Sequence, residues 1–345
     1  MRFPEFSGEW ENTELQYIAP NICSGKDKPT SNGTVALYGS TGIIGMTRLA
    51  SYNEEIVLVA RVGANAGQLQ ITTIPCGVTD NTLIINAKEW NRYIYYYLQH
   101  YNLNRLVFGS GQPLITGSML KKLKIIYGEE SERNKIVNLL CLLDERIATQ
   151  NKIIEDLKKL KSAISLKMLH SDSWEQFKIQ DIASIGRGRV ISSVEISQQE
   201  NPLYPVYSSQ TSNDGIMGYL DDFMFEGEYI SWTTDGANAG TVFYRNGKFN
   251  CTNVCGLLKL KKGFDAHFVS LVLAEATRMY VSTNLANPKL MNNTMGNIQI
   301  RLPKLEEQKR ISVVFRKLHG LLETHNSLII KYSKQKQYLL SQMFI

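Results

Sequence analysis

The sequence lacks a long apolar run. None of its 345 residues lies in a stretch that approaches the roughly 18 consecutive apolar residues of a membrane-spanning helix. Residues 1–6 also lack the basic segment and the following apolar segment that mark a secretory signal. We therefore expect a cytoplasmic protein that has no membrane partner.

Cysteine is scarce, and its number is odd. The five cysteines are scattered along the chain, which favours reduced thiols over a disulfide framework. Cys251 and Cys255 have a spacing that occurs in zinc sites, but neither a second pair nor a histidine cluster accompanies them. We predict that this pair belongs to strand packing and that the protein holds no metal.

Common catalytic motifs are missing as well. Residues 201–204, Asn-Pro-Leu-Tyr, are similar to the Asn-Pro-Pro-Tyr motif of adenine methyltransferases, but the third position differs and no glycine-rich turn precedes them. We interpret them as a loop that enters a strand at residues 204–207. Residues 109–111 and 186–188 lack the Lys-Ser or Lys-Thr ending of a phosphate-binding loop, and no histidine lies in a triad motif. We expect a binding protein without a cofactor, not an enzyme.

What the sequence does contain is an internal repeat. The letters GANAG at residues 63–67 recur at 236–240, and GIIG at 42–45 recurs as GIMG at 215–218 with the same displacement. Three further matches share a slightly larger displacement: Pro113 with Pro288, Ile125 with Ile300, and Ile136 with Ile311. Independent matches at nearly one displacement indicate a duplication, with copies of about 170 residues.

Each copy begins with a region that predicts mixed α and β structure. Short β-branched and aromatic runs, such as residues 55–60 and 227–232, alternate with Gly, Asn, Ser and Thr, which is typical of strands joined by turns. Residues 86–101 and 265–280 lack strict alternation and predict one helix per copy. The expected fold class is α+β, with two such domains and a long helix after each.

The long helices are predicted by a heptad pattern. Apolar side chains recur at alternating steps of four and three from position 136 to 168 and again from 311 to 343. The first seam consists of Ile136, Leu140, Leu143, Ile147, Ile154, Leu157 and Ile164. The second seam consists of Ile311, Phe315, Leu318, Leu322, Ile329, Tyr332 and Leu339. A helix of this length reaches roughly 55 to 60 Å, more than one small domain can cover, so we predict that the two helices pair.

Both seams have polar interruptions at the same two positions. Gln150 and Lys161 interrupt the first seam, and His325 and Lys336 interrupt the second. Gln150 and His325 either face one another or pair locally, and buried polar residues of this kind often fix the register of a helix pair. The two lysines are expected to reach the edge of the seam, because a long aliphatic stem lets the ammonium stay in water.

Connectivity gives the helix pair a direction. The first helix delivers the chain to the second domain, so the second helix has to run back along it, antiparallel, with one domain at each end. Two similar domains related in this way match the two-fold pseudo-symmetry of duplex DNA, where half-sites lie about one helical turn apart. The net charge of +6 is compatible with a polyanionic partner but does not by itself indicate one.

The end of the second copy resembles a known family. Residues 302–311, LPKLEEQKRI, with the long helix that ends in LLSQMF at 339–344, are similar to the conserved region that closes the specificity subunits of type I restriction-modification systems. Trp174 and the GIMG sequence resemble parts of the target-recognition domains of that family. The first copy departs from the closing motif: Gly128, Ser131 and Arg133 replace Pro303, Glu306 and Gln308.

The resemblance implies a subunit that recognises a bipartite target in double-stranded DNA. Each domain would read one half-site, and the helix pair would set the spacer. The expected partners are two methyltransferase (M) subunits and, for cleavage, ATP-dependent restriction (R) subunits, which would carry the chemistry. The alternative is a coiled-coil scaffold that binds partner proteins or RNA. The predicted boundaries are 1–128 and 171–302 for the recognition domains, and 129–170 and 303–345 for the helices.

Basic and polar residues near predicted loops are the candidates for contacts with DNA. Candidates for phosphate contacts are Lys26, Lys28, Arg61, Arg105 and Lys121 in the first copy and Arg187, Arg189, Arg245 and Lys289 in the second. Candidates for base readout are Ser40, Thr41 and Gln112, and Ser209, Gln210 and Asn287. The ordinary alternative for each cation is a solvated surface charge. Asn65 and Asn238 in the repeated GANAG element either contact an adenine edge in the major groove or hold a turn by bonding its backbone, and we favour the turn.

Overall fold

The computed structural model describes residues 2–106, 113–282 and 287–344. The chain divides into two compact units, Met1–Ile153 with His325–Ile345, and Ile154–Thr324. Within the described ranges no helix is both long enough and apolar enough to cross a membrane.

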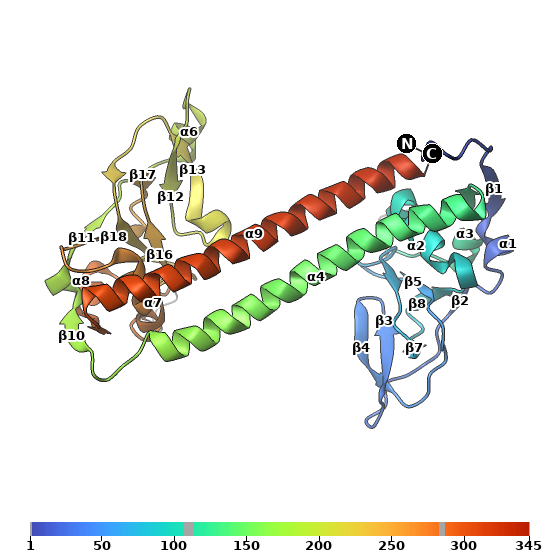
Figure 1. Ribbon diagram of the computed structural model, residues 1–345, viewed down its shortest axis with the longest axis horizontal. Coiled ribbons are helices and arrows are strands. Elements are labelled where there is room, and N and C mark those ends of the chain that lie inside the picture. Colours follow the sequence, from blue (N-terminus) through green and yellow to red (C-terminus); the bar gives the residue numbers. More distant parts are fainter. Residues whose placement is uncertain (1, 107–112, 283–286, 345) are drawn as a thin grey trace. The chain divides into compact units, whose positions relative to one another are not determined.

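The first unit holds the first recognition domain, whose strands form small sheets (Figure 1). The four-stranded sheet has the order β2 (Cys23–Ser24), β8 (Thr82–Ile85), β5 (Val57–Ala60), β6 (Leu69–Ile71). The three-stranded sheet has the order β4 (Gly42–Thr47), β3 (Val35–Gly39), β7 (Cys76–Val78), and a two-stranded sheet joins β1 (Glu11–Glu14) to β9 (Lys124–Tyr127).

Helices cover one face of the four-stranded sheet in this unit. They are α1 (Leu15–Ile18), α2 (Asn91–Tyr101), α3 (Gly117–Lys121) and the start of α4 (Glu130–Met168). Because side chains alternate along a strand, Val57 and Val59 face Ile94 of α2, whereas Leu58 packs in a second cluster with Val78 of the three-stranded sheet. The four-stranded sheet is therefore the middle layer of the domain.

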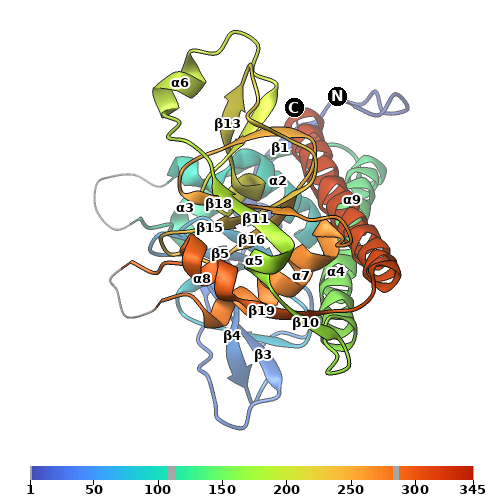
Figure 2. The same cartoon turned by 90° about the vertical axis from the view of Figure 1, so that its left-hand side faces the viewer.

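The second unit repeats this plan. Its main sheet has the order β11 (Ala183–Arg187), β18 (Cys255–Leu260), β15 (Tyr229–Thr233), β16 (Val242–Arg245). Its other sheets have the orders β13 (Ile216–Leu220), β12 (Tyr204–Tyr207), β17 (Lys248–Cys251), β14 (Phe225–Glu226), and β10 (Glu175–Lys178), β19 (Gln299–Leu302). Its helices are α5 (Ile179–Ile182), α6 (Ser193–Ser197), α7 (Ala266–Ala276), α8 (Asn292–Asn297) and the start of α9 (Leu305–Met343), several of which lie beside the main sheet in Figure 2.

Apart from β14, the strands of the two domains correspond one to one in sheet order, which confirms the duplication. In each domain one strand pair is parallel, β3 with β7 and β12 with β17, although the other strand pairs are antiparallel. Each domain also has a register shift at the same tyrosine, Tyr38 in the first and Tyr207 in the second. The second domain adds α6 and β14. The predicted helices at 86–101 and 265–280 are confirmed as α2 and α7.

Both long helices are continuous over 39 residues, and in each unit their segments run antiparallel. In the first unit, Met343 and Phe344 pack in one core with Ile136 and Leu140. In the second unit, Ile164 packs in one core with Ile311 and Phe315. The remaining seam residues lie buried or half-buried: Leu143, Ile147, Ile154, Leu157, Leu318, Leu322, Ile329, Tyr332 and Leu339.

The polar interruptions that fall within the first unit meet partners across the helix pair. The Nδ1 of His325 lies 2.6 Å from Oε1 of Gln150, so these two residues face one another. The Nζ of Lys336 lies 2.7 and 2.9 Å from the carboxylate oxygens of Asp144. Lys336 is therefore held in an ion pair and is not free at the edge of the seam. The carboxylate of Asp144 neutralises its ammonium there.

All five cysteines are free thiols, as expected. Cys251 ends β17 and Cys255 begins β18, and both are buried in one apolar cluster with Phe249 and Leu257. The prediction that this pair belongs to strand packing is confirmed. Within the described residues, no group of three or more His, Cys, Asp and Glu side chains could hold a metal ion.

Candidate nucleic-acid interface

The repeated GANAG element forms the same turn in both domains. Gly63 N donates to Pro113 O at 3.1 Å, and Gly236 N donates to Pro288 O at 3.0 Å. All four glycines of the two elements have positive φ, between 79° and 91°. Only glycine adopts this conformation readily, so the prediction of tight turns is confirmed.

Each GANAG turn lies at one edge of its four-stranded sheet, next to the segment that carries Pro113 or Pro288. Behind the turn, Ile115 N donates to Arg61 O and Leu290 N donates to Thr234 O, at 2.8 and 2.9 Å. In the second domain the turn also touches the β12–β13 loop, because Asn238 Nδ2 lies 3.4 Å from Ser209 O. We call this part of each domain the GANAG edge: residues 61–67 and 113–116 in the first domain, and 208–215, 234–240 and 287–292 in the second.

Among the predicted phosphate contacts of the first domain, Arg61 belongs to its GANAG edge, and Arg105 is exposed in the short helical turn Leu103–Leu106. Arg61 is half-buried, its Nη1 lies 3.4 Å from Ser24 Oγ, and its Nε has no hydrogen-bond partner among the described residues. Lys26 and Lys28 are exposed in the connection between β2 and β3. Lys121 is half-buried at the last position of α3.

The predicted cations of the second domain are more strongly engaged. Arg187 Nε donates to Asn292 Oδ1 at 2.9 Å, which ties the end of β11 to the start of α8. Lys289 is half-buried and its backbone bridges to Asp235 and Ser282.

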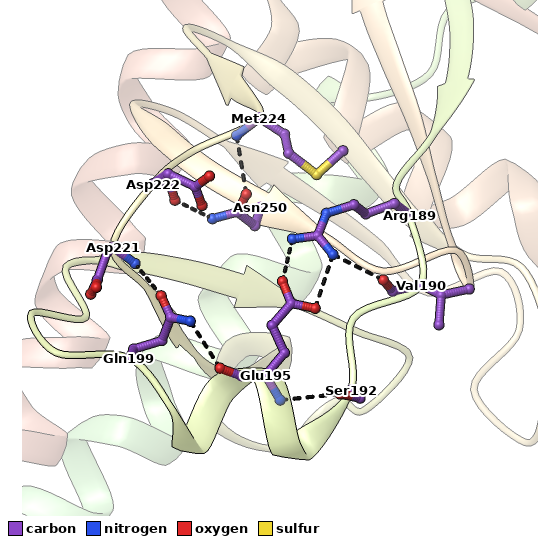
Figure 3. Close-up of polar contacts among 9 residues, drawn as sticks. All are labelled: Arg189, Val190, Ser192, Glu195, Gln199, Asp221, Asp222, Met224 and Asn250. Carbon is purple, nitrogen blue, oxygen red and sulfur yellow. Dashed lines mark hydrogen bonds and ion pairs between the residues drawn. The ribbon is translucent and has the colours of Figure 1, made fainter.

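Arg189 lies in a network of polar contacts around α6 (Figure 3). Its guanidinium forms an ion pair with Glu195 and also donates to Val190 O at 3.1 Å. The hydrogen bond from Arg189 holds the pKa of Glu195 below its usual range, so the carboxylate stays ionised beside the arginine. Arg189 therefore holds α6 in this structure, and a contact with phosphate would compete with Glu195.

A second set of contacts joins α6 to the turn after β13. Gln199 Nε2 donates to Glu195 O, while Gln199 Oε1 accepts from Asp221 N, each at 2.9 Å (Figure 3). Asn201 N donates to Asp221 Oδ1 at 2.8 Å, and β12 begins at Tyr204. The interpretation of residues 201–204 as a loop that enters a strand is confirmed.

The predicted base-reading residues fall on loops of different length. Ser40 and Thr41 form the tip of a tight hairpin, since Gly39 pairs with Gly42. In the second domain, eight residues separate the paired Tyr207 and Ile216. There Gln210 Nε2 donates to Ile216 O and Asn287 Nδ2 donates to Asp235 Oδ1, so both amides hold the local backbone. Gln112 lies outside the described residues.

Arg245, a predicted phosphate contact, is instead buried in an ion pair with Asp214, and the length of the β12–β13 loop was not foreseen. Arg245 ends β16 and is 2% exposed, although an arginine in a basic chain is most simply read as a surface charge. The only signal in the sequence was a change of displacement between two matches, Tyr38 with Tyr207 and Gly42 with Gly215. Four steps along the first copy thus correspond to eight along the second, which places the insertion between these matches.

A family model agrees with this duplicated architecture. The model described as the type I restriction modification DNA specificity domain matches residues 2–159 and again 171–331. The chain belongs to this family. It carries two DNA specificity domains, each with the first part of the long helix that follows it.

Specificity subunits of Mycoplasma pneumoniae are among the proteins to which this chain is similar. A putative type I specificity subunit is 41% identical over 177 residues, which cover 50% of this chain and 73% of the relative. The specificity subunit of the type I restriction enzyme MpnII is also 41% identical over 177 residues, which cover 50% of this chain and 53% of that subunit.

Solved structures of the same family share the fold over nearly the whole chain. The S subunit of a type I restriction-modification system from M. genitalium has a TM-score of 0.79 at 17% identity and covers 98% of this chain and 96% of its own. A chain from a study of complex assembly and conformational transition of the type I R-M system has a TM-score of 0.55 at 14% identity, with 99% and 98% covered. At these identities the likeness concerns the fold.

Proposed function

We propose that this chain is the DNA sequence-specificity subunit of a type I restriction-modification complex, and that each recognition domain reads one half of a bipartite target. The observation that carries the proposal is that one shared sheet frame carries two different loops, residues 40–41 between β3 and β4 and residues 208–215 between β12 and β13. Two half-sites of different sequence require two recognition domains that share one frame but present different side chains to the bases.

The spacer between the half-sites would be set by α4 and α9. The Gln150–His325 contact supports one register of the pair, since shifting the helices by one turn would leave both polar side chains without their partner. Inserting one heptad into each helix is then expected to change the spacer length while leaving the bases of both half-sites unchanged.

Chemistry would belong to partner proteins. Two methyltransferase subunits would modify the target, and ATP-dependent restriction subunits would cleave it, while this chain supplies recognition alone and needs no cofactor of its own. Purified without these partners, it is expected to bind DNA without methylating or cleaving it.

The decisive experiment is methylome sequencing of a host with and without this gene, its methyltransferase partner present in both. The expected result is a methylated motif with two half-sites and a fixed gap that disappears with the gene. Methylation without any sequence preference would overturn the proposal. Binding to RNA or to a protein partner in place of duplex DNA would favour a scaffold instead.

Phosphate contacts can be tested separately by the dependence of affinity on salt. Replacing Lys26 or Lys28 by Met is expected to weaken binding of all sequences about equally and to lower the slope of log K against log [salt] by about one per contact. Lys152, exposed on α4, provides a matched control, because its replacement by Met is expected to leave that slope unchanged. A changed base preference in the Lys26 or Lys28 variant would contradict a role confined to phosphate.

A further inference from the structure

Arg245 is a buried cation that lies outside the phosphate and base contacts of the proposed function. Its Nη1 donates to Asp214 Oδ2 at 2.7 Å and its Nε donates to Ser231 Oγ at 3.1 Å. Its Cζ lies 3.6 Å from the ring centroid of Tyr207. The guanidinium is thus stacked, bonded and paired at the base of the β12–β13 loop.

The counterion of this buried cation comes from the loop itself. The side chain of Asp214 is 67% exposed, whereas that of Arg245 is 2% exposed. A buried cation is costly unless it is paired. Any conformation of the loop that removes Asp214 from Arg245 therefore carries that cost, and the ion pair selects the conformation in which both meet.

The backbone of the loop shows why such a brace is needed. Three consecutive residues have positive φ, namely Asn213 at 49°, Asp214 at 53° and Gly215 at 81°. Left-handed backbone at two adjacent non-glycine residues persists only where surrounding contacts hold it. Besides Arg245, those contacts include Gln210 Nε2 on Ile216 O and Ser208 N on Gly215 O.

The tip of the braced loop carries side chains that are available to a partner. Thr211, Ser212 and Asn213 are exposed, and among the described residues none of them has a side-chain partner. The amide of an asparagine can donate to and accept from the edge of an adenine in the major groove at once. Asn213 is the one amide among these three.

The first domain lacks both the loop and its brace. Thr72 occupies the position of Arg245, since it pairs with Ile56 as Arg245 pairs with Tyr229. Its Oγ1 accepts from Ile56 N, and the hairpin above it needs only Ser40 and Thr41 to turn. The buried arginine therefore occurs in the domain that has the longer loop.

We propose that Arg245 is a positioning residue for base recognition: it holds residues 208–215 in one conformation, and the amide of Asn213 then reads an adenine in the second half-site. This inference rests on the proposed function and assigns part of the recognition to residues that share no sequence motif.

The test uses the full chain with its methyltransferase partner and a library of DNA duplexes with both half-sites randomised. Arg245→Lys keeps the charge but loses the planar fork and the stacking on Tyr207. Asp214→Asn, at an exposed position, removes the counterion and keeps the fold testable if the arginine variant does not fold. Asn213→Ala removes the proposed reader, and Lys248→Met removes a cation from an exposed pair elsewhere in the domain as the matched control.

We expect Arg245→Lys, Asp214→Asn and Asn213→Ala to relax the preference for the same adenine by roughly tenfold, the size of one bidentate contact, with the first half-site unchanged. The Lys248→Met control is expected to keep both preferences. The inference is overturned if the variants bind more weakly or melt earlier but keep the base preference of the second half-site, because Arg245 would then be structural only. A wild-type chain without preference at either half-site would instead refute the proposed function.

Discussion

The two recognition domains fill one sheet position in opposite ways. In the second domain Trp232 of β15 pairs with Gly256 of β18, and a Cβ on that glycine would lie 2.1 Å from the indole ring. In the first domain Val59 pairs with Leu83 at the equivalent place. A tryptophan beside a glycine and a valine beside a leucine occupy similar volumes. The sheet therefore preserves the combined volume of the two side chains and not their residue types.

The starts of the long helices differ in a comparable way. Gln308 Nε2 donates to Pro303 O at 2.8 Å, and Arg133 Nη1 donates to Gly128 O at 3.1 Å, with donor and acceptor at equivalent positions of the repeat. Gln308 Oε1 also accepts from Asp265 N, whereas the guanidinium of Arg133 stacks over the ring of Trp90. Although the first copy departs from the closing motif in residue type, the carbonyl at the equivalent position still accepts a side-chain hydrogen bond.

The largest effect is expected from exchanging the packed pair of the second domain for that of the first. Trp232→Val is expected to cost about 3 kcal/mol or more and Gly256→Leu a similar amount, because one leaves a cavity and the other overlaps the indole. The double variant should recover a large part of the loss, although Leu290 O would still lack its indole donor. Urea denaturation of the four chains measures the coupling, and purely additive costs would show that the two pairs are not equivalent solutions.

A smaller difference is expected between the two helix starts. Gln308→Ala is expected to cost about 1 to 3 kcal/mol, because it leaves Asp265 N and Pro303 O unpaired inside the second unit. Arg133→Ala is expected to cost about 1 kcal/mol, since a half-exposed stack on Trp90 and one carbonyl contact are lost. Chemical denaturation with hydrogen exchange resolves each unit, and equal costs would contradict the difference in burial.

Acid is expected to weaken the second unit more than the first. Burial, with Arg316 nearby, lowers the pKa of His267 from 6.5 to about 4, while Asp265 opposes this shift and His319 and Lys161 add to it. The unfolded chain binds a proton below about pH 6.5, so the stability from a neutral His267 is present above that pH and is lost as the pH falls toward 4.

This pH dependence can be measured against a matched position. Arg92 occupies the equivalent place in the first domain and does not titrate in this range. The urea concentration at which half of the second unit is unfolded is expected to decrease when the pH is lowered from 7 to 5. The His267→Gln variant is expected to show a smaller decrease. An unchanged slope in the variant would assign the acid sensitivity to other groups.

The smallest effect concerns an interior position of the long helices. Gly320 lies within α9, nothing stands within 4 Å of a Cβ placed on it, and Glu145 occupies the equivalent position in α4. Gly320→Ala is expected to stabilise the chain by about 0.5 to 1 kcal/mol, because alanine loses less backbone freedom on folding. Calorimetry should show a higher melting temperature for this variant and little change for Glu145→Ala; a lower one for Gly320→Ala would mean that the site is not open.

Much of the fold was predictable because it is encoded in local periodicity. The GANAG turns need positive φ at glycine, and the heptad spacing needs a helix, so both follow from residue types and their spacing. Sequence reasoning expected one helix in each globular part and did not foresee the short helices α1, α3, α5, α6 and α8. Of these, α6 belongs to one domain only, as does the strand β14, so no repeat could reveal either. Their short lengths also leave little periodic signal.

The candidate interface was less predictable, because it depends on which distant groups meet. Arg189 looked like a free cation, yet it is paired with Glu195 after the chain turns through α6. Gln210 looked like a reader, yet its amide holds Ile216 O. A side chain in a loop has many possible partners, and the path of the backbone selects among them.

The sequence by itself determined the duplication, the order of domains and helices, and the two polar positions in each seam, since identical residues at one displacement impose the same local structure twice. The tertiary structure alone decided that Gln150 meets His325, and that Arg245 is buried against Asp214 and Tyr207. The physical reason is that these contacts join residues from 31 to 175 positions apart, whose meeting depends on packing and not on the pattern around either one.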